Sequence, residues 1–225
     1  MPRERPAPNL KGVPARRPDE QPDAVKVLVV DDHPALRQGL EGLLRQEDGF
    51  LPLGALPDAD EISATIDGLR PDVVILDYAL EQDDGLSVCF RIKQRPSPPA
   101  VVLYSAYVDP IFAVPATLAQ ADAIVSKTAP VEELLSILRS TASGERRMPA
   151  LDRDAMSAAS ARLAPEDLPV AGMLFARVTI REIAETLAVH PERVRAQALK
   201  IIGELQARDR ITGAAGGRQA AFSAG

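Results

Sequence analysis

The chain has 225 residues, a formal net charge of −6 and a single cysteine, which excludes an internal disulfide and a zinc cluster built on several cysteines. Its length suits one or two domains, and no apolar run is long enough to span a bilayer, so we expect a cytoplasmic protein without a membrane partner. The acidic balance argues against a chain coated with nucleic acid, yet it allows one locally basic module.

Residues 25–145 alternate short apolar segments with longer segments of helical periodicity. Apolar segments of strand length lie at residues 25–30, 50–56, 73–77, 100–106 and 121–126. Segments with helical spacing follow them at residues 35–46, 59–69, 85–95, 109–120 and 131–143. The unbroken apolar run from Val73 to Leu76 is typical of a strand buried on both faces of a parallel sheet. Five β/α units in this order predict an α/β domain with a doubly wound, five-stranded parallel sheet.

Chemically active side chains stand at the ends of four of the five predicted strands. These residues are Asp31, Asp32, Asp77, Ser105 and Lys127. Because the carboxyl ends of parallel strands meet at one edge of the sheet, where such folds bind ligands, we expect these residues to converge. Each of them alone has an ordinary explanation, such as a helix N-cap for Asp31, so it is their combination that carries the prediction.

The expected cluster suits a metal ion and a phosphoryl group. Three carboxylates in one crevice repel each other, and Mg²⁺, a divalent cation that takes oxygen ligands, relieves that repulsion. The Lys127 ammonium would neutralise phosphoryl oxygens at the same edge, and the Ser105 hydroxyl would donate a hydrogen bond to them. Asp77, which lies centrally, is then the candidate nucleophile that forms an aspartyl phosphate.

These strand ends resemble the receiver domain of two-component response regulators. The matching sequences are Val-Val-Asp-Asp-His at 29–33, Leu-Asp at 76–77, Tyr-Ser-Ala at 104–106 and Val-Ser-Lys-Thr at 125–128. The resemblance covers residues 25–145 and implies a flavodoxin-like fold, a bound Mg²⁺ and a phosphoryl group received from a sensor histidine kinase. It also implies a protein that is not an enzyme and has at most an autophosphatase activity.

The resemblance assigns a role to each matching acidic residue. Asp32 would be a direct ligand of Mg²⁺, with Asp31 assisting it. Asp77 would be the phosphoacceptor, and its side chain and the backbone carbonyl of Ala79 would complete the metal shell. Ala79 has no polar side chain that could position a hydrolytic water, which predicts a long-lived phosphoryl group.

The resemblance also assigns the switch. Ser105 would be the switch hydroxyl, and Lys127 would contact the phosphoryl oxygens. Receivers usually carry an aromatic residue three positions before this lysine, and Ile124 stands there instead. This departure leaves the phosphorylation chemistry intact and puts the transmission of the signal in doubt.

Composition divides the rest of the chain into a second module and segments without periodicity. Residues 1–24 are rich in proline and residues 211–225 in glycine and alanine, so we expect both to be disordered tails. Residues 146–162 lack periodicity and are expected to be a linker. They join the receiver-like domain, 25–145, to a helical module at 163–210.

The helical module carries the pattern of a helix-turn-helix. Thr179 and Glu182 have the spacing of a capping box at the start of one helix. A tight turn at 188–190 separates this helix from another that begins at Pro191, a residue favoured in the first turn of a helix. Two helices joined by such a short turn predict a helix-turn-helix.

Residues 182–194 resemble the helix-turn-helix of LuxR-type DNA-binding domains. On this match, the residues facing the major groove of a promoter half-site or its phosphates would be Arg193, Arg195, Gln197 and Lys200. Between 177 and 210 the chain has seven basic residues against five acidic ones. This excess of positive charge is small, whereas a DNA-binding surface usually carries a strongly basic patch.

We therefore expect a response regulator in which phosphorylation of Asp77 favours a homodimer that binds paired half-sites in promoter DNA. The alternative is a phosphorylatable receiver that controls a protein partner through a degenerate helix-turn-helix, without specific DNA binding. A hydrolase with an aspartate nucleophile is disfavoured, because Ala79 stands where such a phosphatase has its acid.

Overall fold

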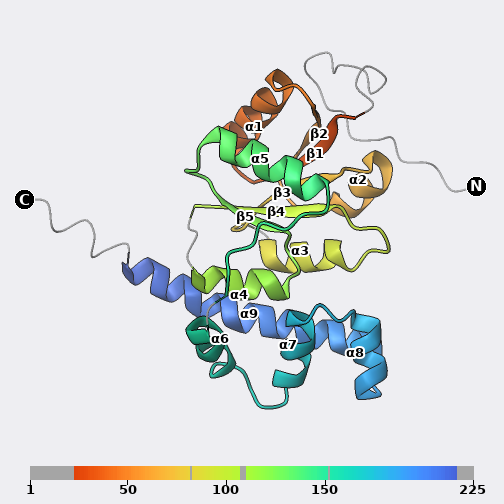
Figure 1. Cartoon of the computed structure of the whole chain (residues 1–225), viewed down its shortest axis with the longest axis vertical. Helices are drawn as coiled ribbons and strands as arrows, with labels where there is room; N and C mark the ends of the chain where they lie inside the picture. The colour runs from red at the N-terminus through yellow and green to blue at the C-terminus, as the bar shows by residue number, and fades with distance from the viewer. Residues whose placement is uncertain (1–22, 82, 107–109, 152, 217–225) are drawn as a thin grey trace, which may run out of the picture.

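The structure, a computed structural model, describes residues 23–216 except 82, 107–109 and 152. Its centre is a five-stranded parallel sheet in the order β2-β1-β3-β4-β5 (Figure 1). The strands are β1 (Val25–Val30), β2 (Phe50–Leu56), β3 (Val73–Asp77), β4 (Ala100–Ser105) and β5 (Ala123–Ser126). The parallel sheet and its alternation with helices confirm the predicted α/β fold.

Strand β3 lies at the centre of the sheet, and all five of its residues are buried. It pairs in parallel with β1 on one side and with β4 on the other, and Asp77 stands in register with Tyr104. Strand β5 pairs with the outer side of β4. These pairings bring the carboxyl ends of the strands to one edge of the sheet, so residues distant in sequence become neighbours there.

Helices cover both faces of the sheet. One face carries α1 (Pro34–Gln46) and α5 (Val131–Ala142). The other face carries α2 (Ile62–Leu69), α3 (Gly85–Lys93) and α4 (Pro110–Leu118). On the first face Leu40, Leu44 and Leu138 close one apolar core against the sheet, because their helical spacing puts them on a single side of each helix.

Helix α3 begins directly against the carboxyl end of β3. Asp84 caps it by accepting hydrogen bonds from the backbone N–H groups of Leu86 and Ser87. A Cβ atom at Gly85 would lie 2.3 Å from the carbonyl oxygen of Asp77, so no larger residue fits at this approach. The start of α3 is thereby fixed to the backbone of the residue that ends the central strand.

Four further helices follow the sheet domain. They are α6 (Arg153–Ser160), α7 (Leu168–Phe175), α8 (Ile180–Leu187) and α9 (Pro191–Gly216). The capping box of α8 is present, since the Thr179 hydroxyl accepts from the Glu182 N–H and the Glu182 carboxylate accepts from the Thr179 N–H. The turn between α8 and α9 places Ala188 in the left-handed region, at φ 53°.

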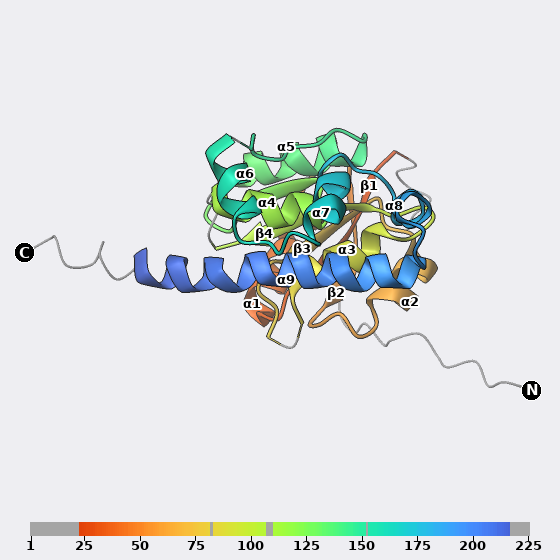
Figure 2. The ribbon, with the colours of Figure 1, turned by 90° about the horizontal axis from the view of Figure 1, so that it is seen from below.

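Helix α9 packs lengthwise against the sheet domain (Figures 1 and 2). It contacts α4 and α3, and it also contacts α7 and α8 of its own module, while α6 and α7 reach α4. One apolar core therefore continues from the sheet into the helical module, with Leu118 of α4 and Leu205 of α9 both fully buried. No helix of the described residues is long and apolar enough to cross a membrane.

The segment expected to be a linker, 146–162, contains α6 and is tied to the sheet. The Arg147 N–H donates to the carbonyl of Asp122 at 2.8 Å, and Arg147 forms a parallel bridge with Ala123 of β5. Helix α9 extends past residue 210, where we expected the module to end. Most of the two expected tails, residues 1–22 and 217–225, lie outside the described residues.

Candidate functional site

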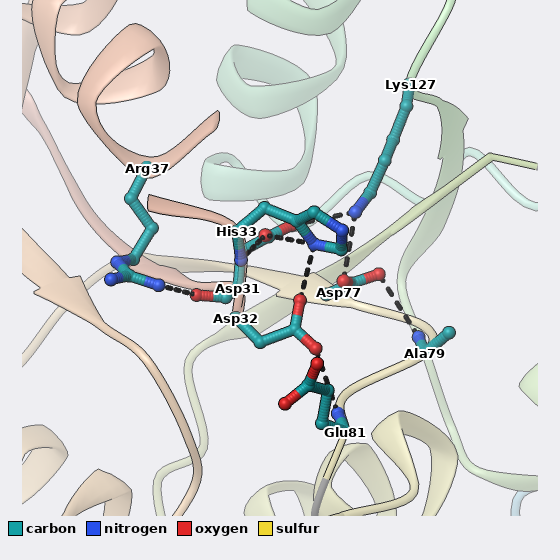
Figure 3. Close-up of polar contacts among 8 residues, drawn as sticks. All are labelled: Asp31, Asp32, His33, Arg37, Asp77, Ala79, Glu81 and Lys127. Atoms are coloured by element: carbon teal, nitrogen blue, oxygen red, sulfur yellow. Dashed lines mark hydrogen bonds and ion pairs between the residues drawn. The ribbon is translucent and has the colours of Figure 1, made fainter. Parts of the chain in front are cut away.

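Residues from three strand ends form an acidic pocket at the carboxyl edge of the sheet (Figure 3). Lys127 Nζ donates to Asp31 Oδ2 at 2.8 Å and lies 2.9 Å from Asp77 Oδ2. The side chains of Asp31 and Asp77 are 2 % and 3 % exposed. One ammonium group thus bridges two buried carboxylates, and the three residues converge as their positions after the strands predict.

Asp32 lies beside this triad, nearer to solvent. Its Oδ2 accepts a hydrogen bond from the Glu81 N–H at 3.0 Å, and its Oδ1 lies 2.5 Å from Nδ1 of His33. This Oδ1 is buried but accepts no hydrogen bond from any described residue. The His33 backbone N–H donates to Asp31 Oδ1 at 2.8 Å, which fixes the Asp31 carboxylate against the segment that leads into α1.

The structure also places the other residues predicted for the pocket. Ser105 is buried at the end of β4, and its carbonyl accepts the Lys127 N–H at 2.7 Å, so the lysine loop starts next to this strand. The Ala79 N–H donates to Asp77 Oδ1 at 3.1 Å. The roles expected of the Ser105 hydroxyl and the Ala79 carbonyl stay predictions.

Arg37, which the sequence analysis missed, and Tyr104, which belongs to the matching Tyr-Ser-Ala sequence, contact residues of the pocket. Arg37 of α1 donates from Nη1 to the Asp31 carbonyl at 2.6 Å. Lys127 Nζ lies 5.9 Å from the ring centroid of Tyr104, near the limit for a cation–π contact. Strand alternation identifies Tyr104 as a core residue of β4, and no motif in the sequence distinguishes Arg37 from an ordinary helix residue.

Burial and charge pairing set the protonation of the pocket. Burial raises the pKa of Asp77 above its ordinary value, against the opposing effect of Lys127 and of the Ala79 N–H. Burial alone would lower the pKa of Lys127, but its hydrogen bonds with Asp31 and Asp77 outweigh this effect and raise the pKa. The lysine is therefore charged at neutral pH, and its charge favours an ionised Asp77.

The donor atoms of the pocket fit a hard divalent cation. Ligand atoms of Asp31, Asp32, His33 and Asp77 all lie within 4.8 Å of one another. Carboxylate oxygens are the ligands that Mg²⁺ prefers, and the buried Asp32 Oδ1 accepts no hydrogen bond from the described residues, although His33 Nδ1 lies at ion-pair distance from it. The described residues therefore include an acidic cluster suited to a divalent cation.

In the helical module, two of the four residues predicted to contact DNA form hydrogen bonds within the module, and their roles toward DNA stay predictions. Gln197 Nε2 donates to Asp167 Oδ1 at 2.8 Å, and Lys200 Nζ donates to Asp167 Oδ2 at 2.9 Å. Burial would raise the pKa of Asp167, but these two contacts outweigh it and lower the pKa. In this arrangement Gln197 and Lys200 hold the start of α7 against α9.

The other two predicted residues differ in exposure. Arg193 is exposed to solvent. Arg195 is half-buried and pairs with Glu192 one turn earlier, while its Nε is buried without a hydrogen-bond partner in the described part of the chain. Their roles toward DNA therefore stay predictions.

Helix α9 buries two adjacent stripes of side chains. The first stripe is fully buried and has the spacing of a helix-turn-helix core; it consists of Val194, Ala198, Ile201 and Leu205. A second stripe, about 100° around the helix, consists of Arg195, Leu199, Ile202 and Gln206. Helix α9 contacts α4 and α3 of the sheet domain as well as α7 and α8 of its own module.

The docking surface on the sheet domain has a sequence feature that the sequence analysis did not use. Residues 110–121 carry no charged side chain. A helix that is apolar on every side is typical of one buried on every side, and α4 is indeed covered by the sheet on one side and by the helical module on the other. Tyr78 packs edge-on against Phe112 of α4, with ring centroids 5.4 Å apart.

A doubly wound parallel sheet with a buried aspartate, two further carboxylates and a lysine at its carboxyl edge defines an α/β protein of the receiver class. Comparison with known sequences agrees: residues 27–139 match the family described as "Response regulator receiver domain". The chain therefore belongs to the response regulator receiver family.

Relatives are similar to the chain beyond this domain. "Transcriptional regulatory protein LiaR" of Bacillus subtilis is 25 % identical over 84 % of this chain and 95 % of its own length. "Probable transcriptional regulatory protein NarL" of Mycobacterium tuberculosis is 27 % identical over 87 % of this chain and 94 % of its own length. The chain is thus a response regulator whose similarity to these regulators includes the helical module.

Solved structures show the same fold. The receiver domain of the putative response regulator NarL from Mycobacterium tuberculosis has a TM-score of 0.52 and 28 % identity, covering 55 % of this chain and all of that one. A two-component response regulator of the LuxR family from Aurantimonas sp. SI85-9A1 has a TM-score of 0.53 and 25 % identity, covering 60 % of this chain and 94 % of that one.

Proposed function

We propose that this response regulator accepts a phosphoryl group on Asp77 from a sensor histidine kinase in the cytoplasm and acts as a homodimer on paired half-sites of promoter DNA. The observation that carries the first part is the position of Lys127 Nζ, between Asp31 and Asp77 and in contact with both. The transcriptional regulators that are similar over most of the chain support the second part.

The chemistry follows from the pocket. An Asp77 carboxylate oxygen attacks phosphorus of a phosphohistidine, an O–P bond forms, and the N–P bond breaks with its electron pair returning to the imidazole. Lys127 neutralises the transferred oxygens at the moment when it gives up part of its contact with Asp77. The Ser105 hydroxyl, buried at the end of β4, donates to a phosphoryl oxygen. The chain itself catalyses no turnover of a substrate.

Asp31, Asp32 and Asp77 are the side chains that would hold Mg²⁺, together with the Ala79 carbonyl. When bound, the ion offsets the charge of the carboxylates and of the incoming phosphoryl group. Asp31, whose Oδ2 already binds Lys127, would assist, and Asp32 Oδ1 would be a direct ligand.

The output step is the release of α9. In the docked arrangement α9 lies against α4 and α3, so the side of the helix in this contact is not available to DNA. Arg195 Nε and Gln206 Nε2 of α9 are buried without a hydrogen bond from any described residue, which costs about 1–3 kcal/mol for each atom.

One observation supports the alternative, a regulator that binds a protein partner and not specific DNA. Gln197, Lys200 and Arg195 are engaged by acidic residues of the same module, so few of its predicted DNA contacts are free. Undocked α9, with Leu199 and Ile202, would then present an apolar surface to a partner protein.

The test compares the full-length wild type with Asp77→Asn, each treated with Mg²⁺ and acetyl phosphate or beryllofluoride. We expect the wild type to gain one phosphoryl group by mass, to dimerise and to retain promoter DNA in a salt-dependent manner, while the variant does none of these. A wild type that gains no phosphoryl group and ignores beryllofluoride refutes the proposal. Phosphorylation without retention of specific DNA selects the alternative.

A further inference from the structure

We propose that His33 is a ligand of the divalent cation in the acidic pocket and shifts the pocket's preference from Mg²⁺ toward Mn²⁺. This inference rests on the proposed function, because it concerns the same metal site. It adds a nitrogen ligand to a site otherwise built of oxygen atoms.

The position of the imidazole carries the inference. His33 Nδ1 lies 2.5 Å from Asp32 Oδ1 and 3.4 Å from Asp31 Oδ1. Neighbouring ligand atoms of an octahedral ion with bonds of about 2.1 Å are roughly 3 Å apart, so the two separations bracket the value that a shared cation requires. Figure 3 shows the ring turned over the carboxylates of the pocket.

His33 Nδ1 and Asp32 Oδ1 lie at ion-pair distance, and no hydrogen bond joins these two atoms. Asp32 Oδ1 is buried, yet it accepts no hydrogen bond from the described residues, including the imidazole that lies next to it. The nitrogen and the oxygen are thus close enough to bind one cation together.

A structural role at the start of α1 does not account for the side chain either. His33 occupies the N-cap position of α1, but its side chain makes no capping hydrogen bond. The helix is instead started by Pro34 in its first turn, and the His33 carbonyl accepts from the N–H groups of Leu36 and Arg37. The imidazole is 69 % exposed, so it can move the few tenths of an ångström that coordination requires.

Ligand chemistry then sets the preference. Mg²⁺ takes oxygen ligands and keeps several waters, whereas imidazole suits the divalent ions of the first transition series, with Mn²⁺ the weakest of that series. A site with carboxylates and one imidazole therefore gains more affinity for Mn²⁺ than for Mg²⁺ from its histidine.

The test is pulsed electron paramagnetic resonance of Mn²⁺ bound to the full-length protein. We expect a ¹⁴N coupling typical of imidazole in the wild type, its replacement by ¹⁵N coupling when histidine is labelled, and its loss in His33→Asn. The chain has two histidines, and His190→Asn is the matched control that must keep the coupling. Titrations should show the ratio of Mn²⁺ to Mg²⁺ affinity falling about tenfold in His33→Asn and staying unchanged in His190→Asn.

The outcomes separate the two proposals. Mn²⁺ that binds the wild type, is lost in Asp32→Asn and shows no imidazole coupling overturns the role of His33 and leaves the phosphoacceptor pocket standing. An unchanged affinity ratio in His33→Asn overturns it equally. Absence of Mn²⁺ and Mg²⁺ binding in the wild type overturns both the metal site and the inference.

Discussion

Arg177 joins the helical module to the sheet domain by a polar contact that one substitution removes. Its guanidinium donates to the carbonyl of Ala121 at 2.9 Å and to that of Gln120 at 3.5 Å. Both carbonyls lie just past the end of α4, where a helix leaves carbonyls unpaired and favours a positive charge. We predict that Arg177→Ala weakens the docking of the helical module without unfolding the sheet.

The size of the effect follows from the geometry. A hydrogen bond from a charged donor contributes about 1.5–3 kcal/mol when it is buried, and a cation at a helix end contributes about 0.3–1 kcal/mol. Arg177 is half-buried, and one of its two contacts is at the limit of hydrogen bonding, so the lower end applies. The expected loss is about 1.5 kcal/mol, which corresponds to roughly a tenfold higher population of the undocked form.

Hydrogen exchange followed by mass spectrometry measures this population. In Arg177→Ala, amides of α4 and of the first three turns of α9 should exchange about tenfold faster, while those of β1 and β3 keep their protection. Arg181→Ala is the matched control, because Arg181 is 85 % exposed and pairs with Glu185 of its own helix. Promoter binding without phosphorylation should rise in the first variant and stay constant in the second.

Two results would refute this reasoning. Equal exchange in Arg177→Ala and Arg181→Ala would show that the contact with α4 contributes nothing to docking. Faster exchange in β1 and β3 as well as in α9 would show that the substitution destabilises the whole chain and does not open one interface.

Three further predictions concern the fold and its coupling to the site. Gly85→Ala places a Cβ 2.3 Å from the Asp77 carbonyl oxygen, so urea denaturation should show a free energy of unfolding lower by about 2–3 kcal/mol, and beryllofluoride should no longer bind. The control Gly39→Ala, whose Cβ meets no atom within 4 Å, should not lower the stability of the protein. Asp167→Asn removes a carboxylate whose pKa is lowered on folding, so the variant should be less stable than the wild type at pH 7. This difference in stability should shrink as the pH falls below about 4, which thermal melts at several pH values measure. A chain ending at residue 145 leaves the apolar α4 uncovered, so it should bind a hydrophobic dye and aggregate, which light scattering detects.

The sheet and the pocket could be predicted because local patterns determine them. An unbroken apolar run predicts β3, and the parallel order of β/α units places the residues after each strand at one edge. Asp31, Asp77 and Lys127 meet for that reason alone. The capping box at Thr179 is likewise a contact between residues three apart, so it can be recognised without knowledge of tertiary structure.

Contacts between the two modules could not be predicted in the same way. The uncharged sequence at 110–121 indicates a helix buried on every side, but it does not say which segment covers it. Gln197 and Lys200 have the residue types of DNA contacts and equally those of partners for a buried carboxylate. In the docked form both side chains bind Asp167, about thirty residues away, and no spacing in the sequence links that residue to α9.

The docked helix also changes the meaning of Ile124. With isoleucine in place of the usual aromatic residue, β5 lacks a ring that could turn inward, and Ile124 is a buried part of the core shared with α4. An aromatic contact exists elsewhere, since Tyr78, the neighbour of Asp77, packs edge-on against Phe112 of α4. A chain of packing contacts from Asp77 to α9 is not enough to couple them. Coupling requires a structural element with two states, whose balance changes at either site. In the proposed function, docked and released α9 are the two states of such an element, and α4 contacts both the Tyr78 ring and α9. A change at Asp77 can therefore reach the output helix through α4, without an aromatic residue at position 124.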